Sequence, residues 1–435
     1  MHPQASPMLF YKTDQLNQKE KDTFRIHLLY SILEGIVLGV LALNEFVFIK
    51  SLKGTNFELG VLFQFSVIVF TGLIFINEFL RRIKNKRKLL RITALVTRLP
   101  LFLLIFFPKS DVAMQGNGIY HFIFLGIFFM YFLASPIVLP NINLFLKSAY
   151  RHENFSKLYS SAVSINKIVM LVVTFAYGLL LDWNPYVYTY VFPFIAIIAT
   201  GSILLLSTIP YQVVEKVEIK KSFLQSVRFS WENMWQLMKS NKSYLHFEIG
   251  FMLYGFAFMS TVAVITIYFD RALGLNYSSI AFYKNAYNII AILLLPFFGR
   301  LLGRIDPRKF AAITFGSMMM FLFFLALTEY FPANIEFLNI KLYYMLLFYI
   351  LFQSIFAATM SLVWFIGSSY FGKDEEAGDL QAIHLSLTGV RALIAPLIGV
   401  LFFELFGYTI TFGIAMLLLL IAIFLMIWSY RRERV

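Results

Sequence analysis

The sequence predicts an all-α integral membrane protein of about twelve transmembrane helices, arranged as two pseudo-symmetric six-helix bundles. Three observations support this fold class: the composition, the number of long apolar segments, and a short motif that recurs half a chain later. Hydrophobic residues make up 59% of the 435 residues and charged residues only 14%, with a mean hydropathy of +0.73. Soluble domains are about 45–50% apolar and about 25% charged. The composition therefore places this chain in a membrane.

Twelve apolar segments approach or exceed the ~20 residues that a helix needs to cross a bilayer. Helices are the expected form because lipid offers backbone groups no hydrogen-bond partner. The segments cover residues 27–50, 58–78, 89–108, 118–146, 159–181, 186–209, 244–270, 278–299, 310–330, 341–371, 380–405 and 409–430.

The polar intervals divide the chain into expected parts. These are an N-terminal tail at 1–26, a six-helix bundle at 27–209, a linker at 210–243, a second six-helix bundle at 244–430 and a C-terminal tail at 431–435. The first tail shows no cleavable signal peptide. In the linker, apolar residues recur every three to four positions beside basic ones, which indicates an interfacial amphipathic helix. A disordered linker is the alternative.

The basic residues predict the topology. The chain has 37 Lys and Arg against 24 Asp and Glu, a net charge of +13. With twelve spans, 28 of the 37 lie on the side of the two termini and five on the opposite side. By the positive-inside rule both termini are cytoplasmic, and we expect a bacterial inner membrane protein. The basic excess is topological, so we expect no nucleic-acid partner.

A short motif occurs twice. The stretch GTNF stands at Gly54–Phe57, and GLNY follows 220 residues later at Gly274–Tyr277. Each comes directly after the first expected helix of a half. Gly35 in the first of these helices corresponds to Gly255 in the other. Two related halves explain this recurrence.

The loop before the segment at 310–330 carries a family signal. It reads GRLLGRIDPRK, from Gly299 to Lys309. This resembles the signature loop of the major facilitator superfamily, Gly-x-Leu-x-Asp-Arg-x-Gly-x-Arg-Arg. The matching residues are Gly299, Leu301, Arg304, Arg308 and Lys309. Gly303 stands where the family has an acid, and Asp306 where it has its second glycine.

The equivalent loop of the first half reads NEFLRRIKNKRK, starting at Asn77. It keeps Arg82, Lys86 and Arg87 of the family pattern but has Arg81 at the position of the acid. The turn GTNFELG also resembles the family's loop between its first two helices.

The resemblance implies secondary transport by alternating access, in which two bundles rock about a site near the bilayer midplane. It implies that the first and fourth helices of each bundle line the cavity, with the second and fifth flanking it. It also implies a cytoplasmic latch between the signature loops, in which Glu78 or Asp306 would replace the missing acids. The expected gating residues are Glu78, Arg82, Gly299, Arg304, Asp306 and Arg308.

Several ionisable residues lie inside apolar segments: Glu34, Glu45, Arg98, Lys167, Lys284 and Arg391. A basic group at the helix centre costs about 2.5–3.5 kcal/mol on insertion scales, so these side chains should face protein or water. Glu34 is a candidate proton carrier, because a carboxylate in a low-dielectric site can bind a proton near neutral pH. A permanent ion pair with a neighbouring base is the alternative.

Glu45 is the second proton-coupling candidate. It follows Glu34 by eleven residues, which at 100° per residue places both on one face of the first helix, about 16 Å apart along the axis. Because Glu45 lies near the outer end of its segment, we expect a gate or interface role for it.

Lys167 and Arg391 are the principal substrate-binding candidates. Lys167 shares a helical face with Ser160, Ser164 and Thr174, while Arg391 shares one with His384 and Thr388. Both helices are the fifth of their half, so the two cations are expected to approach one cavity and bind an anion there, Arg with a bidentate fork. Alternatively, each pairs with Glu34 or a helix end.

Other polar residues in the spans complete the substrate-binding candidates: Asn141, Asn143, Lys284, Gln353, Trp364 and His384. Ordinary interhelical hydrogen bonding is the alternative for each of them, and Lys284 could also snorkel outward. For Arg98, whose helix the family resemblance places at the periphery, we expect a structural partner.

The sequence favours a transporter over an enzyme. It has no HExxH, Walker or Gly-x-Ser-x-Gly motif, and we expect no metal or cofactor. The leading hypothesis is a monomeric, proton-coupled carrier of a small or amphiphilic organic anion. Its expected partners are the substrate, protons or another coupling ion, and the lipid bilayer. The alternatives are an exporter of hydrophobic or cationic drugs, and a non-transporting membrane sensor or assembly protein.

Overall fold

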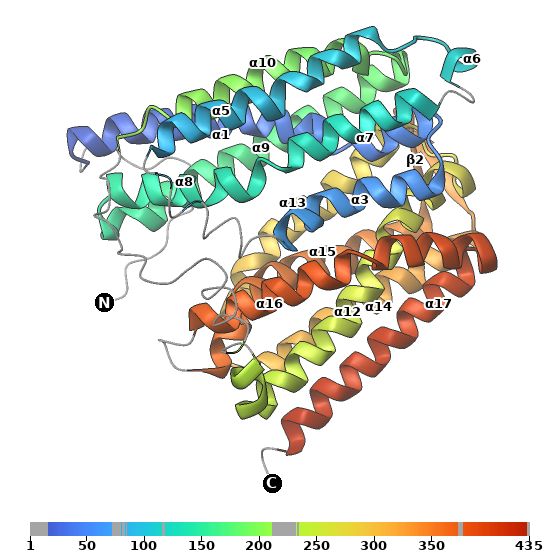
Figure 1. Ribbon diagram of the computed structural model, residues 1–435. Coiled ribbons are helices and arrows are strands. Elements are labelled where there is room, and N and C mark those ends of the chain that lie inside the picture. Colours follow the sequence, from blue (N-terminus) through green and yellow to red (C-terminus); the bar gives the residue numbers. More distant parts are fainter. Residues whose placement is uncertain are drawn as a thin grey trace. The chain divides into compact units, whose positions relative to one another are not determined.

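A computed structural model describes residues 16–71, 80, 83, 85–114, 118–210, 232, 235–372 and 377–432 (Figure 1). The described chain is almost entirely helical, as predicted, and divides into two compact units. Unit 1 comprises Met1–Lys53 and Phe75–Ile219, and unit 2 comprises Gly54–Ile74 and Lys220–Val435. Each unit is described below by itself.

The helices of unit 1 follow the predicted segments closely. They are α1 (Gln18–Leu41), α2 (Asn44–Phe46), the π-helix η2 (Val47–Ser51), α5 (Lys86–Arg98), the 3-10 helix η3 (Leu99–Phe106), α6 (Asp111–Met114), α7 (Gly118–Phe132), α8 (Ser135–Ala149), α9 (His152–Trp183) and α10 (Tyr188–Leu206).

Unit 2 contains the remaining elements. They are α3 (Asn56–Thr71), α12 (Lys242–Ile267), the π-helix η4 (Tyr268–Ala272), α13 (Tyr277–Leu302), α14 (Pro307–Tyr330), the antiparallel strands β1 (Asn334–Phe337) and β2 (Ile340–Tyr343), α15 (Tyr344–Ile366), the 3-10 helix η5 (Ser368–Phe371), α16 (Ala377–Ala392) and α17 (Ala395–Arg432).

Ten described helices are long and apolar enough to cross a membrane. The span at Ile383–Arg432 covers most of the last two predicted segments, which a non-helical Gly407 (φ 76°) separates inside α17. The second predicted segment is represented by α3, whose described part is shorter. The count of twelve therefore stays a prediction. The expected amphipathic helix of the linker lies mostly outside the described residues.

The placement of α3 differs from the expected bundle boundaries. The sequence assigns this helix to the first bundle, but it packs against α12, α16 and α17 of unit 2. The Nε2 atom of Gln64 donates to the carbonyl of Leu393 at 2.5 Å, and the amide of Asn56 donates to Glu404. The predicted bundle boundaries stay a prediction.

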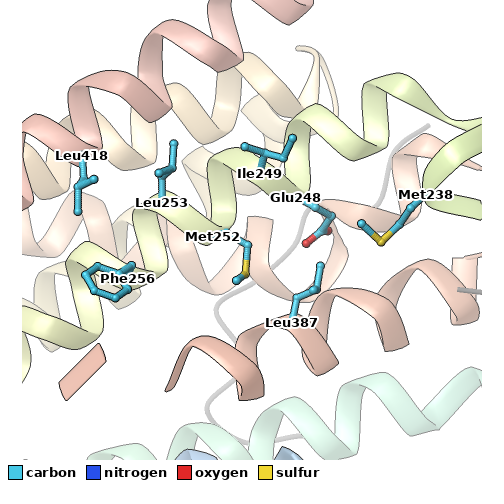
Figure 2. A pocket seen from close by; sticks show the side chains of 8 residues that line it. All are labelled: Met238, Glu248, Ile249, Met252, Leu253, Phe256, Leu387 and Leu418. Carbon is cyan, nitrogen blue, oxygen red and sulfur yellow. The ribbon is translucent and has the colours of Figure 1, made fainter. Parts of the chain in front are cut away.

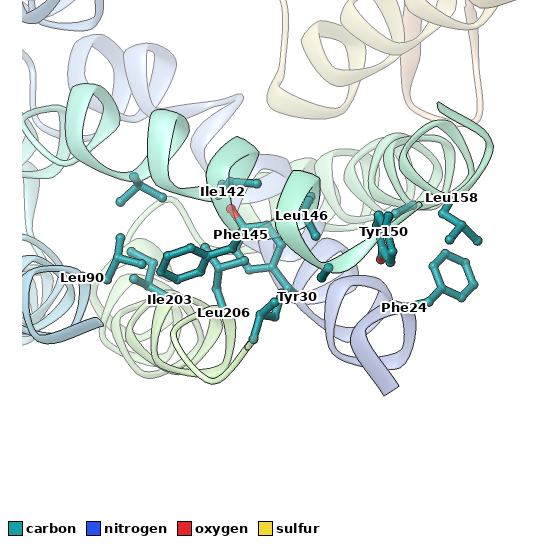
Figure 3. Packing of buried hydrophobic residues seen from close by; sticks show 14 of the residues in the cluster. Phe24, Tyr30, Leu90, Ile142, Phe145, Leu146, Tyr150, Leu158, Ile203 and Leu206 are labelled. Carbon is teal, nitrogen blue, oxygen red and sulfur yellow. The ribbon is translucent and has the colours of Figure 1, made fainter. Parts of the chain in front are cut away.

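The core of unit 1 forms where α1, α5, α8, α9 and α10 converge around residues such as Tyr30, Leu90, Phe145 and Ile203 (Figure 3). Helix α1 lies against α9 along Gly35 and Gly39, one turn apart. A Cβ atom on Gly35 would lie 2.7 Å from the carbonyl oxygen of Asn166. Small residues at this spacing let two helices in a membrane approach closely.

The first helix ends in the same way in both halves. In each, the helix closes with a π-helical turn, η2 or η4. A residue with positive φ follows: Lys53 at 59° in unit 1 and Gly274 at 56° in unit 2, 221 residues later. Glycine favours this conformation because it has no Cβ. The backbone conformation thus recurs one residue out of step with the sequence motif: it falls on Lys53, just before Gly54, in the first half and on Gly274 itself in the second.

Candidate functional site

The predicted residues His384 and Arg391 lie on one face of α16, and that face packs against α12. The two helices run parallel in register, because three residues spread along α12 each contact a partner 136 positions later. The hydroxyl of Tyr244 donates to the carbonyl of Leu380 at 2.7 Å, and Nδ1 of His384 lies 3.0 Å from the Glu248 carboxylate. The third pair in this register is Gly255 and Arg391.

Arg391 is held against the backbone of α12. Its Nη1 donates to the carbonyl of Phe251, and its Cζ lies 5.7 Å from the ring centroid of Tyr254. Gly255 makes the space for the guanidinium, because a Cβ there would lie 1.9 Å from Cζ of Arg391. The side chain is only 5% exposed, and Nε has no hydrogen-bond partner among the described residues.

His384 is enclosed by aromatic rings and is 1% exposed. The rings of Phe251, Phe247 and Trp364 lie 4.8, 6.3 and 6.3 Å from its imidazole. Nδ1 contacts Glu248, whereas Nε2 has no partner among the described residues. The fold therefore brings three predicted site residues, His384, Arg391 and Trp364, to one region of unit 2.

The sequence reasoning missed Glu248. This acid is buried at 2% exposure, and its carboxylate lies 3.0 Å from Nδ1 of His384. It is the one acid in the first twenty residues of α12. An acid inside an apolar segment is the feature by which the sequence could have identified it. Glu248 also lines a pocket of about 330 Å³ against α12, α16 and α17, whose other lining residues are apolar (Figure 2).

In unit 1, Glu34 lies within the bundle beside α10. Its carboxylate accepts a hydrogen bond of 3.0 Å from the hydroxyl of Ser202 and interacts electrostatically with Arg98. Arg98 is 4% exposed, donates to the carbonyl of Tyr131 at 2.7 Å and stacks on that ring. This matches the structural partner expected for Arg98. Arg98 is also a neighbouring base of the kind that the ion-pair alternative for Glu34 requires.

The first predicted segment, residues 27–50, is not one continuous helix. Helix α1 ends at Leu41, and Glu45 lies in the separate short helix α2, just before the π-helical turn. A constant rotation of 100° per residue does not extend across this break. The predicted common face of Glu34 and Glu45 therefore loses its geometric basis.

The other predicted residues have varied environments. Lys167 is exposed on α9 in unit 1, whereas Arg391 is buried in unit 2. Asn141 is buried, and its amide donates to the carbonyl of Ile137 in its own helix. Lys284 and Gln353 are half-buried. The side chain of Asn143 lies outside the described part.

The signature loop of unit 2 closes an end of the helix bundle. Asp306 caps α14 and binds Arg308 through both carboxylate oxygens, at 3.0 and 2.8 Å. Arg308 also donates to the carbonyl of Ser429 at 3.1 Å. Burial raises the pKa of Asp306, but the hydrogen bonds from Arg308 and the charges of Arg308 and Lys309 outweigh it, so that the net pKa is lowered.

Of the remaining gating residues, Gly299 and Arg304 are exposed. Glu78 and Arg82 lie outside the described residues. Within the described chain, no three His, Asp or Glu side chains gather as a metal site would require.

Comparison with known families decides the identity. The model of the Major Facilitator Superfamily matches residues 26–340, most of the chain. The chain belongs to the Major Facilitator Superfamily. It is thus a membrane transporter of that superfamily, and the family resemblance of its loops is confirmed. No curated protein matches the sequence.

Solved structures share the fold of this superfamily member. A nucleoside transporter, NupG, aligns with a TM-score of 0.69 at 14% identity, over 95% of this chain and 99% of its own. The inward-open xylose transporter XylE from E. coli aligns with a TM-score of 0.58 at 14% identity, over 93% and 95%. A structure of proton-dependent oligopeptide transporters aligns with a TM-score of 0.58 at 12% identity, over 95% and 99%. At these identities the likeness concerns the fold alone.

Proposed function

We propose that this superfamily member is a secondary active transporter that moves a small or amphiphilic organic anion by alternating access, coupled to protons. The known structures of similar fold include nucleoside, xylose and peptide transporters. Their different substrates give no direct indication of the one carried here. The choice of an anion therefore rests on the residues of this chain.

The observation that carries the proposal is the unpartnered guanidinium nitrogen of Arg391 on α16. Its Nε is buried without a hydrogen-bond partner among the described residues. The ring nitrogen Nε2 of His384 is also buried without one there, and it can donate when the imidazole is protonated. A buried donor left unsatisfied costs about 1–3 kcal/mol. A ligand that brings an acceptor oxygen would remove this cost, and a guanidinium binds carboxylate or phosphate oxygens with charge-assisted hydrogen bonds.

Lys167 is the proposed second cation of the anion site, contributed by unit 1. Its exposure on α9 leaves its ammonium group available to a ligand. Proton coupling is assigned to Glu34, with Glu45 in a gating role. Glu34 is a carboxylate inside a candidate span, where ionisable groups are functional by default.

A ligand screen followed by transport assays tests the proposal. Purified protein is heated with a panel of carboxylates, phosphates, organic cations and neutral sugars, because a bound ligand raises the melting temperature by mass action. Stabilising compounds are then followed into proteoliposomes with and without a pH gradient. We expect stabilisation by anions and accumulation driven by the gradient. Stabilisation by cations alone would favour the drug exporter, and binding without uptake would favour the sensor.

A further inference from the structure

We propose that the pocket against α12, α16 and α17 binds an acyl chain of an anionic membrane phospholipid, whose headgroup lies at Lys239 and Lys242. This lipid site is separate from the proposed anion site on Arg391. Unlike the transported solute, its occupant stays in the bilayer.

The pocket has the lining of a hydrocarbon site. Its volume is about 330 Å³, and its walls carry Met, Leu, Ile and Phe side chains with Glu248 as the single ionisable group. Glu248 is 2% exposed and contacts His384 Nδ1 at 3.0 Å, so its charge is already partnered. Methionine side chains such as Met252 adapt to irregular apolar surfaces. An alkyl chain suits these walls.

The pocket is open to the surroundings of the helix bundle at Ile249, whose side chain is 42% exposed. Ile249 belongs to the candidate span Lys242–Ala272, so the opening lies at a level that the bilayer covers when the helix crosses it. In our proposal the opening faces hydrocarbon, and an acyl chain enters sideways from the lipid.

One end of the pocket adjoins a basic surface. Met238 and Glu248 lie at one end, and Phe256 and Leu418 lie at the other (Figure 2). Met238 is followed directly by the exposed Lys239, and the exposed Lys242 begins α12. Seven residues separate Lys242 from Ile249, which places both on the same side of the helix. The cations thus lie beyond the Met238 end.

Charge and aromatic residues identify the headgroup. Between residues 235 and 250 the only acid is the buried Glu248. The Nζ atom of Lys239 lies 5.4 Å from the ring centroid of the exposed Trp235. Tryptophan gathers at the level of lipid headgroups, and lysines there attract anionic lipids. Two such lysines give a preference of about thirtyfold over a zwitterionic lipid.

Native mass spectrometry tests the assignment on the full-length protein. The protein is equilibrated in micelles with equal amounts of dioleoyl phosphatidylglycerol and dioleoyl phosphatidylcholine, and the two bound forms are counted. We expect phosphatidylglycerol to be bound about ten- to thirtyfold more. The double variant Lys239→Gln/Lys242→Gln should bring the ratio near one. Leu253→Trp, which fills the pocket, should reduce binding of both lipids without changing the ratio.

A matched control separates the site from general attraction. Lys88→Gln/Lys147→Gln removes the same charge from exposed lysines of unit 1 and should keep the wild-type ratio. Glycerol 3-phosphate, which has a headgroup but no chain, should not compete at the same concentration; competition would indicate a phosphate site and overturn the lipid assignment. Equal binding of the two lipids by wild type would overturn it too, as would equal loss in both double variants. If Leu253→Trp does not fold, the wild type and the lysine variants decide.

Discussion

Gly255 and the guanidinium of Arg391 fit together so closely that a Cβ on the glycine would lie 1.9 Å from Cζ of the arginine. No real Cβ tolerates that distance, so even alanine at this position must displace the arginine or the helix. A predicted binding residue on α16 therefore depends on a glycine of the neighbouring helix α12 for its space. The close fit also offers a way to move Arg391 without removing its charge.

Gly255→Ala is therefore expected to weaken anion binding about tenfold or more, with a stability cost of about 1–3 kcal/mol from overpacking. Isothermal titration with the ligand found in the screen and thermal unfolding measure the two effects. Gly316→Ala is the matched control, because no atom lies within 4 Å of a Cβ there. It should leave affinity unchanged and stability equal or slightly higher. Unchanged affinity in Gly255→Ala would separate Arg391 from the substrate.

Neutralising the two predicted cations should have different effects on stability. Lys167 is exposed, so Lys167→Gln should change stability by no more than about 0.5 kcal/mol. Arg391 is buried and bound to a carbonyl, so Arg391→Gln should also destabilise the protein. Each variant should lose about 1.5–3 kcal/mol of binding free energy, a factor of about ten to a hundred or more.

Melting temperature and ligand affinity, measured on the same preparations, test this expectation. Strong destabilisation by Arg391→Gln with normal affinity per folded molecule would show a purely structural role. Full affinity in Lys167→Gln would restrict the anion site to unit 2.

Glu34→Gln should abolish accumulation driven by a pH gradient while sparing exchange of labelled for unlabelled substrate. The reason is that exchange requires no net proton movement. Uptake into proteoliposomes under both conditions measures the difference. Ser202→Ala, which removes the hydrogen bonds of this hydroxyl to Glu34 and to the carbonyl of Ala199 but keeps the carboxylate, should keep gradient-driven uptake. Normal accumulation in Glu34→Gln would leave Glu34 as the ion-pair partner of Arg98.

The Asp306–Arg308 pair predicts a pH-dependent stability. The pKa of Asp306 is lowered from its ordinary value of 3.8 in the folded protein. Ionised Asp306 therefore stabilises the fold above pH 3.8, and this contribution is lost as the pH falls from there through the lowered pKa. Thermal unfolding of wild type and Asp306→Asn between pH 7 and 3 should show a difference that shrinks only at the acidic end. A difference independent of pH would assign the effect of Asp306 to its capping of α14.

Topology can be tested with reporters. The distribution of basic residues predicts that a reporter after Val435, or inserted between Arg82 and Lys88, is cytoplasmic, and that one near Asp111 is external. Alkaline phosphatase and green fluorescent protein fusions report the two sides. An external C-terminus would contradict the count of twelve spans.

The sequence alone predicted the parts of the fold that depend on composition and period. The apolar segments predicted the positions of the helices, most ends to within a few residues. The exceptions are the starts of α1 and α9, which come earlier than predicted, the segment 118–146, which is divided into α7 and α8, the described end of α3 at Thr71, and α17, which merges two segments across Gly407. The breaks were not predictable from hydropathy. The interruption after Leu41 and most of the π-helical turn Val47–Ser51 lie inside the predicted segment 27–50, which hydropathy treats as one span.

Helical faces predicted part of the candidate site. The seven-residue spacing of His384 and Arg391 placed them together on α16, and both do face one neighbouring helix. Periodicity could not say which helix that would be. Glu248 was therefore overlooked, and Gly255 was noticed only as part of a repeat. Similarly, the association of α3 with unit 2 depends on contacts more than three hundred residues apart in sequence.

The carbonyl groups of Leu52 and Leu273 follow the π-helical turns of the two halves, and each is contacted by a side chain 69 or 70 residues further on. In unit 1 this is Nε2 of His121 at 2.8 Å, and in unit 2 the hydroxyl of Tyr343 at 3.1 Å. The two halves therefore supply different donors, an imidazole and a phenol, to corresponding backbone oxygens, and in unit 2 Nζ of Lys341 adds a second donor at 3.2 Å. The shared requirement is the carbonyl that needs a donor, and more than one kind of side chain fulfils it.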